Sequence, residues 1–248
     1  MLRLVTDRFD PPALDTAVSA AVLHRVASGL EPPTLRLWTP LRSVAFGRQD
    51  GARPGYRTAV AAVAALGFAP VERLAGGRAA VFHEGTIAFS WALPEPHGPA
   101  TITARFSIIA GLVTRALASL GLDARIGEIP GEYCPGEWSV NLGGTHKVMG
   151  VGQRLIRGGA HVGGVIVVTG PELVNLPLVP AYRALEYEWR PEVTGAIEQA
   201  AAGIDAEQVI AALIGALEAS GEAVVPGRLD AACLDQAAAL APEHDATR

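Results

Sequence analysis

The chain of 248 residues is 50% apolar and 18% charged with a net charge of −5, which is typical of folded globular proteins and excludes a disordered chain. Asp7 and Asp10 come before any apolar run long enough for a signal peptide. The apolar stretch 102–120 is interrupted by Arg105 and Arg115, which disfavours a membrane span. These features predict a cytoplasmic protein that is neither exported nor held by a membrane.

The two cysteines, Cys134 and Cys233, show no paired spacing with each other or with histidines, which argues against a metal site and against a disulfide framework. Charge is uneven along the chain. Residues 73–157 carry eight Arg or Lys against six Asp or Glu, whereas residues 191–248 carry two Arg against ten acids. We therefore expect an acidic partner at the central segment. The sequence has no basic run and no stripe of basic and aromatic residues, so no pattern predicts that the protein binds nucleic acid.

Hydrophobic periodicity predicts alternating helices and strands over the first half of the chain. Apolar residues at helical spacing indicate a helix over 13–28, with Asp10 as its cap. Glycines that follow the apolar patterns end two further helices. We expect these helices at 58–66 and 102–120, and strands at 34–38, 43–46, 71–73, 79–82 and 86–93.

The second half begins with a Gly- and Pro-rich loop at 127–136, which carries Cys134. The pattern then predicts units of mixed α and β character. A main domain would span residues 1–190, and the Ala-rich, acidic residues 191–248 would form a small helical segment. The remaining predicted elements are strands at 138–142, 147–150, 153–157 and 161–168, and helices at 209–219 and 229–241, the last with Asp230 near its start.

Lys147 is the only lysine among twenty basic residues, the others being arginines. Such a solitary lysine suggests a site that needs a compact ammonium, although a chance surface lysine gives the same composition. A paired glycine, Gly76–Gly77, lies between two predicted strands. Without Cβ atoms, its backbone amides can approach a carbonyl, an oxyanion or a phosphate, but most such pairs are simple hairpin turns.

Three motifs in order give these residues a context. They are Phe46-Gly-Arg-Gln-Asp50, the segment from Arg73 to His83, and Lys147 to Gln153. Together the motifs resemble the catalytic domain shared by lipoate ligases, biotin ligases and octanoyltransferases, over most of residues 36–168. The resemblance implies an α+β fold, in which a mixed, largely antiparallel sheet is flanked by helices and residues 1–190 form the catalytic domain. It also implies that the Gly-Gly loop and the lysine strand line a tunnel for a medium-length acyl chain.

The loop from Glu132 to Val140 resembles the cysteine-bearing loop of octanoyltransferases related to ligase A. By this resemblance Cys134 is the nucleophile, and Lys147 stabilises the acyl carbonyl oxygen. Thioester exchange onto a cysteine followed by attack of a lysine amine needs no ATP. Cys233 is expected to be a buried small hydrophobe instead. The acyl- or cofactor-binding residues implied are Arg73, Gly76, Gly77, Arg78, Ala79, His83, Gly150, Gln153, His161 and Gly163.

The leading hypothesis is an octanoyltransferase that moves an octanoyl or lipoyl group from an acyl carrier protein to a lysine of a lipoyl-domain protein, without a cofactor. Arg73, Arg78, Arg154 and Arg157 could meet the acidic partners. An ATP- and Mg²⁺-dependent lipoate or biotin ligase is the alternative, which Arg78 disfavours because ligases usually have a third glycine there. A homologue that binds the acyl group without turnover is a further alternative. For His83 and His161, a structural role is favoured over proton transfer. The sequence leaves the acyl group, the acceptor and the oligomeric state open.

Overall fold

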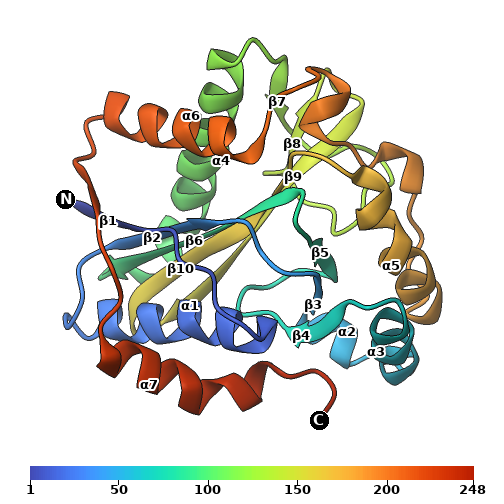
Figure 1. Cartoon of the computed structure of the whole chain (residues 1–248), viewed down its shortest axis with the longest axis horizontal. Helices are drawn as coiled ribbons and strands as arrows, with labels where there is room; N and C mark the ends of the chain where they lie inside the picture. Colours follow the sequence, from blue (N-terminus) through green and yellow to red (C-terminus); the bar gives the residue numbers. More distant parts are fainter.

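The computed structural model describes residues 1–248, and its centre is an eight-stranded mixed sheet (Figure 1). Strand β1 pairs in parallel with β11 and with β2, and every other pairing in this sheet is antiparallel. The spatial order is β11 (Val224–Pro226), β1 (Leu2–Val5), β2 (Thr34–Trp38), β6 (Thr86–Glu95), β10 (Gly158–Val167), β9 (His146–Ile156), β8 (Val140–Leu142) and β7 (Ala124–Ile126).

A second, three-stranded sheet lies beside the first. In it, β3 (Ser43–Phe46) pairs in parallel with β4 (Ala69–Glu72) and antiparallel with β5 (Ala80–Phe82). The chain between β4 and β5 is the Gly-Gly loop, residues 73–79. The loop lies against β9, because the Gly76 amide donates a hydrogen bond to the carbonyl oxygen of Gln153 at 3.2 Å.

Helices cover both faces of the large sheet. Figure 1 shows α4 (Ile102–Ser119) and α6 (Ala206–Ala219) on one face, with α1 (Pro12–Ala27) and α7 (Ala231–Leu240) on the other. Three further helices, α2 (Arg48–Gly51), α3 (Tyr56–Ala65) and α5 (Pro171–Ala184), lie by the small sheet. Short 3₁₀ turns are η1 (Gly98–Thr101), η2 (Pro191–Val193), η3 (Ile197–Gln199) and η4 (Ala241–His244).

The predicted fold class is confirmed, because a mixed and largely antiparallel sheet lies between helices. Most helices and strands fall within a few residues of their predicted bounds. Asp10 was wrong as the cap of α1, since Pro11 takes that position without a side-chain hydrogen bond. The two strands predicted at 147–150 and 153–157 are one strand, β9, because its glycines pair in the ladder rather than interrupting it.

Helix α5 was not predicted, and the sequence explains why. It contains Pro177 and Pro180 in its interior, each of which ordinarily costs about 3 kcal/mol in a helix. Burial of the face formed by Val174, Leu178 and Tyr182 against the small-sheet side offsets that cost. Tertiary packing, rather than local propensity, thus forms this helix.

Helix α4 is long and apolar enough, by length and hydropathy alone, to cross a membrane. In this fold one of its faces packs on the sheet and on α6 through side chains such as Ile109 and Val113. Its Arg105 is buried in an ion pair with Glu95. One face of the helix is therefore part of the core.

The C-terminal segment packs on the body of the protein through β11 and α7, in addition to the contact of α6 with α4. Strand β11 pairs with β1, and α7 packs on α1. Asp230 caps α7 by accepting a hydrogen bond from the Cys233 amide at 2.7 Å. Cys233 is fully buried, which raises the pKa of its thiol, so the expectation of a buried hydrophobe is confirmed. A division of the chain after residue 190 stays a prediction.

Candidate active site

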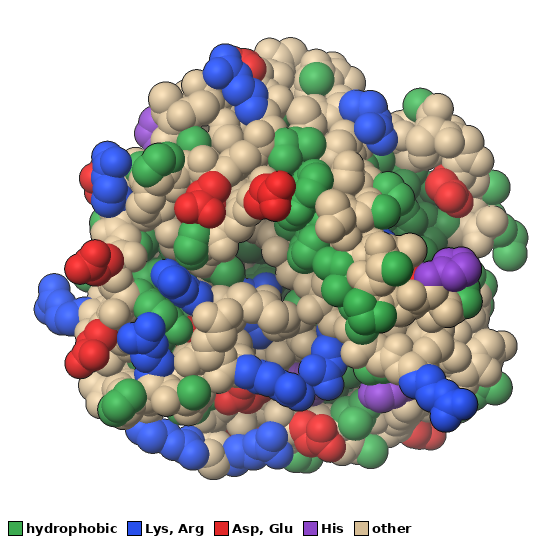
Figure 2. Space-filling model, turned by 180° about the vertical axis from the view of Figure 1, so that it is seen from behind, with side chains coloured by type: hydrophobic (Ala, Val, Ile, Leu, Met, Phe, Trp, Pro, Cys, Tyr) green, Lys and Arg blue, Asp and Glu red, His purple; other side chains and the backbone are tan.

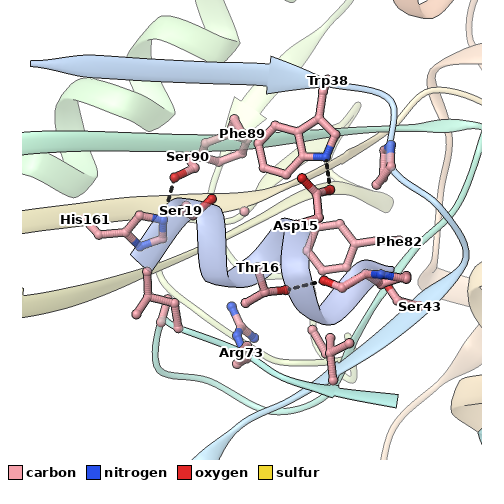
Figure 3. Close-up of a pocket in the computed structure, with 18 of the residues that line it drawn as sticks. Asp15, Thr16, Ser19, Trp38, Ser43, Arg73, Phe82, Phe89, Ser90 and His161 are labelled. Atoms are coloured by element: carbon pink, nitrogen blue, oxygen red, sulfur yellow. Dashed lines mark hydrogen bonds between the residues drawn. The ribbon is translucent and has the colours of Figure 1, made fainter. Parts of the chain in front are cut away.

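A pocket lies between α1, the two sheets and the Gly-Gly loop (Figure 3). The cavity is open at its mouth, and its volume is about 90 Å³. Its walls are mainly apolar and so suit an apolar chain. The apolar side chains that line it are Pro12, Trp38, Pro40, Leu41, Ala45, Val71, Leu74, Ala75, Phe82 and Phe89.

One wall of the pocket carries His161, which reaches in from β10. Its Nε2 lies 3.0 Å from the hydroxyl of Ser90 on β6. Burial, and then the nearby charge of Arg73, lowers the pKa of His161 to about 3. The ring is therefore neutral at physiological pH, and it presents a weakly polar surface rather than a charge.

Asp15 also lines the pocket, but its carboxylate is already occupied (Figure 3). Oδ2 accepts a hydrogen bond from Trp38 Nε1 at 2.6 Å, and Oδ1 pairs with the fully buried guanidinium of Arg36. A buried charge paired in this way has little left to offer a ligand. The pair fixes the position of Trp38 in the wall.

The Gly-Gly loop can approach its neighbours only because side chains are absent. A Cβ on Gly47 would lie 1.9 Å from the carbonyl oxygen of Gly77, and a Cβ on Gly152 would lie 2.7 Å from that of Gly76. Gly77 has φ of +115°, and a Cβ there would lie 2.9 Å from Cys134 Sγ. The three motifs thus meet through glycine backbone, next to the thiol.

Cys134 is half-buried at the surface of the Gly-Gly loop. Its φ is +42°, in the left-handed region that a side chain rarely adopts, and such a conformation costs on the order of 1 to 3 kcal/mol. Its Sγ accepts a hydrogen bond from the Arg78 amide at 3.2 Å and lies 3.8 Å from Arg73 Nη1. The sulfur thus lies between a backbone amide and a guanidinium, and both are hydrogen-bond donors.

Lys147 is fully buried, not at the surface as a chance lysine would be. Its Nζ donates to Glu132 Oε1 at 2.8 Å and to the carbonyl oxygens of Tyr133 and Cys134, each at 2.9 Å. All three N–H groups are therefore used, and every acceptor belongs to the cysteine loop. A Cβ on Gly150 would lie 3.4 Å from Lys147 Cε, so that glycine gives the side chain its room.

Glu132 organises the cysteine loop from inside. Besides the Lys147 ammonium, its carboxylate accepts from the amides of Ile129 and Gly136 and from the hydroxyl of Ser139, at 2.6 to 3.2 Å. The carboxylate is completely buried. Full hydrogen bonding is what allows a buried ion pair to persist. An irregular loop is thus held by an internal charged centre.

Three of the predicted binding residues keep their side chains out of the pocket. His83 lies in the turn after β5, where its Nδ1 accepts from the Gly85 amide at 3.0 Å. Gln153 faces α4, because its side chain bonds Arg105 and the carbonyl oxygen of Ile102. Ala79 is fully buried at the end of the Gly-Gly loop. Their roles in binding stay predictions.

The other predicted residues do gather around the thiol and the pocket. Arg73, His161 and Gly163 line the pocket, and Gly76, Gly77, Arg78 and Gly150 surround the thiol and the lysine. Residues not expected here are Glu132, Gly152 and Tyr182. Glu132 could have been suspected, since an acid stands two residues before Cys134 in a Gly- and Pro-rich loop. No sequence signal indicates Tyr182.

Two arginine side chains stack on Tyr187, whose ring packs on that of Tyr182. The guanidinium carbons of Arg53 and Arg78 lie 4.3 Å and 4.4 Å from the ring centroid of Tyr187. Stacking of this kind holds two cations in place without an acidic partner. Nearby, Asp50 is buried, and this burial raises the pKa of its carboxyl. On the face shown in Figure 2, basic side chains gather beneath a hollow, with acidic ones interspersed.

The sequence model of one protein family, the lipoyl protein ligase A/B catalytic domain, matches residues 11–218, which is most of the chain. The chain belongs to this family. Its membership agrees with the three glycine-rich motifs that the fold brings together at Cys134 and Lys147.

Similar proteins with curated names are transferases. An octanoyl-[GcvH]:protein N-octanoyltransferase of Geobacillus kaustophilus is 30% identical over 169 residues, which cover 68% of this chain and 59% of that protein. A lipoyl-[GcvH]:protein N-lipoyltransferase of Listeria monocytogenes is 26% identical, over 68% of this chain and 62% of that protein. The chain thus spans about 60% of the length of these relatives.

Solved structures show the same fold. A putative lipoate protein ligase from T. acidophilum with bound lipoic acid has a TM-score of 0.73 and 20% identity, covering 97% of this chain and 93% of the other. A lipoate-protein ligase A bound with ATP gives a TM-score of 0.74 at 20% identity, over 97% and 92%. The mixed sheet and its helices therefore follow the lipoate-ligase architecture.

Proposed function

We propose that this protein is an acyltransferase, which moves an octanoyl or lipoyl group between proteins through a thioester on Cys134. The observation that supports this most directly is the placement of the thiol. Cys134 Sγ faces the Arg78 amide at 3.2 Å and lies beside Arg73, a residue in the wall of the apolar pocket. An acyl chain in that pocket would bring its carbonyl carbon to the sulfur.

In the first step, the Cys134 thiolate attacks the acyl carbonyl of the donor and forms the carbon–sulfur bond. The bond from that carbon to the leaving group then breaks, and the leaving amine or thiol takes up a proton. The oxyanion formed in between needs hydrogen-bond donors. The Arg78 amide is one such donor beside the sulfur.

We propose that Lys147 supplies a second donor. Its Nζ bonds the carbonyl oxygen of Cys134 itself, so it lies within reach of the residue that would carry the acyl group. Because all three N–H groups are in use, donation to the acyl oxygen requires exchange of one loop carbonyl for the substrate oxygen. Lys147 would then hold the loop before reaction and the oxyanion during it.

In the second step, the neutral amine of an acceptor lysine attacks the thioester. An amide bond forms, the carbon–sulfur bond breaks, and Cys134 returns as the thiolate after the amine has lost a proton. Moving an acyl group from one lysine amide to another is near neutral in energy overall. Moving it from a carrier thioester to a lysine is downhill. Neither course requires ATP or a metal ion.

The partners follow from the relatives and from the local charge. Since the named relatives act with GcvH, an octanoylated or lipoylated GcvH-like protein is our first candidate donor, and an acyl carrier protein thioester is the second. Lipoyl-domain proteins would be the acceptors. Arg53 and Arg78, which have no acidic partner within ion-pair distance, could meet acidic groups on these proteins.

The test is a transfer assay with the purified protein, a lipoyl-domain acceptor and either octanoyl-GcvH or octanoyl-carrier protein, each with and without ATP and Mg²⁺. We expect the mass of an octanoyl group on the acceptor from at least one donor, independent of ATP. Transfer from free octanoate only with ATP, surviving Cys134→Ala, would indicate a ligase. Binding of octanoate without transfer in any condition would indicate a homologue that has lost turnover.

A further inference from the structure

A fully buried hydroxyl links the two segments that meet at the thiol. Tyr182, on α5, lies 48 residues beyond Cys134 and has no exposed surface. Its Oη accepts a hydrogen bond from the Cys134 amide at 3.0 Å and donates one to the carbonyl oxygen of Ala79 at 2.9 Å. The hydroxyl therefore accepts one hydrogen bond from the cysteine loop and donates one to the Gly-Gly loop.

These two bonds close a ring with the contact to the sulfur. Ala79 follows Arg78 in the chain, and the Arg78 amide donates to Cys134 Sγ at 3.2 Å. Starting from the sulfur, the ring runs through Arg78 and Ala79 to the Tyr182 hydroxyl and back to the amide of Cys134. The Tyr182 hydroxyl thus ties the backbone of Cys134 to that of Ala79, and this second link restrains the distance between the sulfur and the Arg78 amide.

The ring restrains a residue that would otherwise relax. Cys134 has φ of +42°, and such a backbone persists only where its surroundings hold it. Lys147 holds its carbonyl oxygen at 2.9 Å, whereas the only partner of its amide is Tyr182. With that amide released, the backbone is free to turn toward an ordinary conformation and carry the sulfur away from Arg78.

The Tyr182 ring is fixed and its hydroxyl stays protonated. The ring lies between Tyr187 and Trp189, with centroid distances of 5.2 Å to each. Burial raises the pKa of Tyr182 well above its ordinary value, so the hydroxyl remains able to donate to Ala79. A rigid ring with a protonated hydroxyl can define a position to a fraction of an ångström.

We propose that Tyr182 is a positioning residue, whose hydroxyl sets the alignment of the Cys134 sulfur with the Arg78 amide. This role rests on the proposed function for its effect on acyl transfer. Its effect on thiol reactivity does not depend on that function. The hydroxyl does not contact the sulfur, so it acts through the backbone of Cys134 and Ala79.

The test compares Tyr182→Phe with wild type, using alkylation of Cys134 by iodoacetamide and the kcat and KM of octanoyl transfer. Peptide mass spectrometry separates Cys134 from the buried Cys233. We expect alkylation to slow about tenfold and kcat to fall roughly ten- to a hundredfold, with KM for the donor unchanged, because misplacement of a reacting atom lowers the rate rather than binding.

Val174→Ala is the matched control, because Val174 is a fully buried residue of the same helix outside the ring. It should lower the melting temperature as Tyr182→Phe does, yet leave alkylation and kcat within about twofold of wild type. If Tyr182→Phe behaves like this control, the hydroxyl is merely structural and the inference is wrong. If wild type transfers no acyl group while Tyr182→Phe still slows alkylation, the proposed function fails and the positioning role stands.

Discussion

The two ends of the site are built by different physical means. At the thiol end, an irregular loop is held in place by buried hydrogen bonds that Glu132, Lys147 and Tyr182 make with it. At the pocket end, strands and α1 supply mainly apolar walls, in which His161 is neutral and the Asp15 carboxylate is already paired. Directional bonds fix single atoms, whereas apolar walls fix a volume.

This difference separates the two tasks that the proposed reaction requires. The thiol end must place one sulfur against one carbonyl carbon, so a change there should alter the rate constant. The pocket end must accept a chain of a given length, so a change there should alter KM and chain-length preference. The following substitutions test that separation, beginning with the largest expected effect.

Removal of the thiol is expected to have the largest effect. Cys134→Ala should lower acyl transfer by about a thousandfold or more, because no thioester can form. The melting temperature should not fall, since φ of +42° strains Cys134 and Ala alike and the backbone bonds remain. Intact mass spectrometry of the acceptor measures transfer. Activity of Cys134→Ala within tenfold of wild type would contradict the covalent route.

Loss of the buried ammonium should affect both stability and rate. Lys147→Met leaves the Glu132 carboxylate without its cation and should lower the free energy of unfolding by about 3 to 5 kcal/mol. The double variant Lys147→Met with Glu132→Gln should recover part of that stability, because no unpaired charge is left. It should stay inactive, and recovery of transfer would show that Lys147 serves only the loop. Urea denaturation and the transfer assay give the two readings.

The neutral histidine of the pocket should make stability depend on pH. The pKa of His161 is about 3 in the folded chain against an ordinary value near 6.5. As pH falls below 6.5, the unfolded chain takes up a proton that the folded chain does not, so the free energy of unfolding decreases. Between pH 7 and pH 5 the loss from His161 is about 2 kcal/mol. In His161→Gln, the fall in unfolding free energy over this range should be smaller by that amount. An unchanged fall would show that His161 is not held neutral.

A methyl group added inside the pocket should change chain-length preference. A Cβ on Gly163 would lie 2.4 Å from His161 Cε1, so Gly163→Ala should narrow the pocket. KM for an octanoyl donor should rise about tenfold, while a butyryl donor should be affected less. Gly215→Ala on α6 is the control, because an added Cβ there meets nothing within 4 Å. Equal effects on both donors would place Gly163 outside the acyl site.

The smallest effect is expected at the outer cations. Arg53→Ala should raise KM for a protein donor about threefold and weaken its dependence on salt, with kcat unchanged. A small octanoyl-pantetheine thioester should be used as before. Arg42→Ala removes an exposed arginine that is paired with Glu84 and serves as the control. An equal rise in KM for both donors would argue against a protein contact.

Local patterns predicted the central strands and most helices, because periodicity and glycine ends report directly on backbone structure. The short strands β1, β7 and β11 were not predicted, since three or four residues are too few to show a period. The motif glycines also indicated where the thiol and lysine would meet. The ring of hydrogen bonds through Tyr182 could not be predicted from the sequence, since α5 contains two prolines and its helical form depends on packing. The use of all three Lys147 donors likewise depends on how the loop folds back, which no spacing encodes.

The central claim is a thioester on Cys134, and the most direct measurement is rapid acid quenching of the protein with an octanoylated donor, followed by intact and peptide mass spectrometry. An octanoyl adduct on the Cys134 peptide, which hydroxylamine removes and the acceptor domain consumes, is the predicted result. An acceptor that becomes octanoylated while no adduct forms on Cys134 at any time would contradict it.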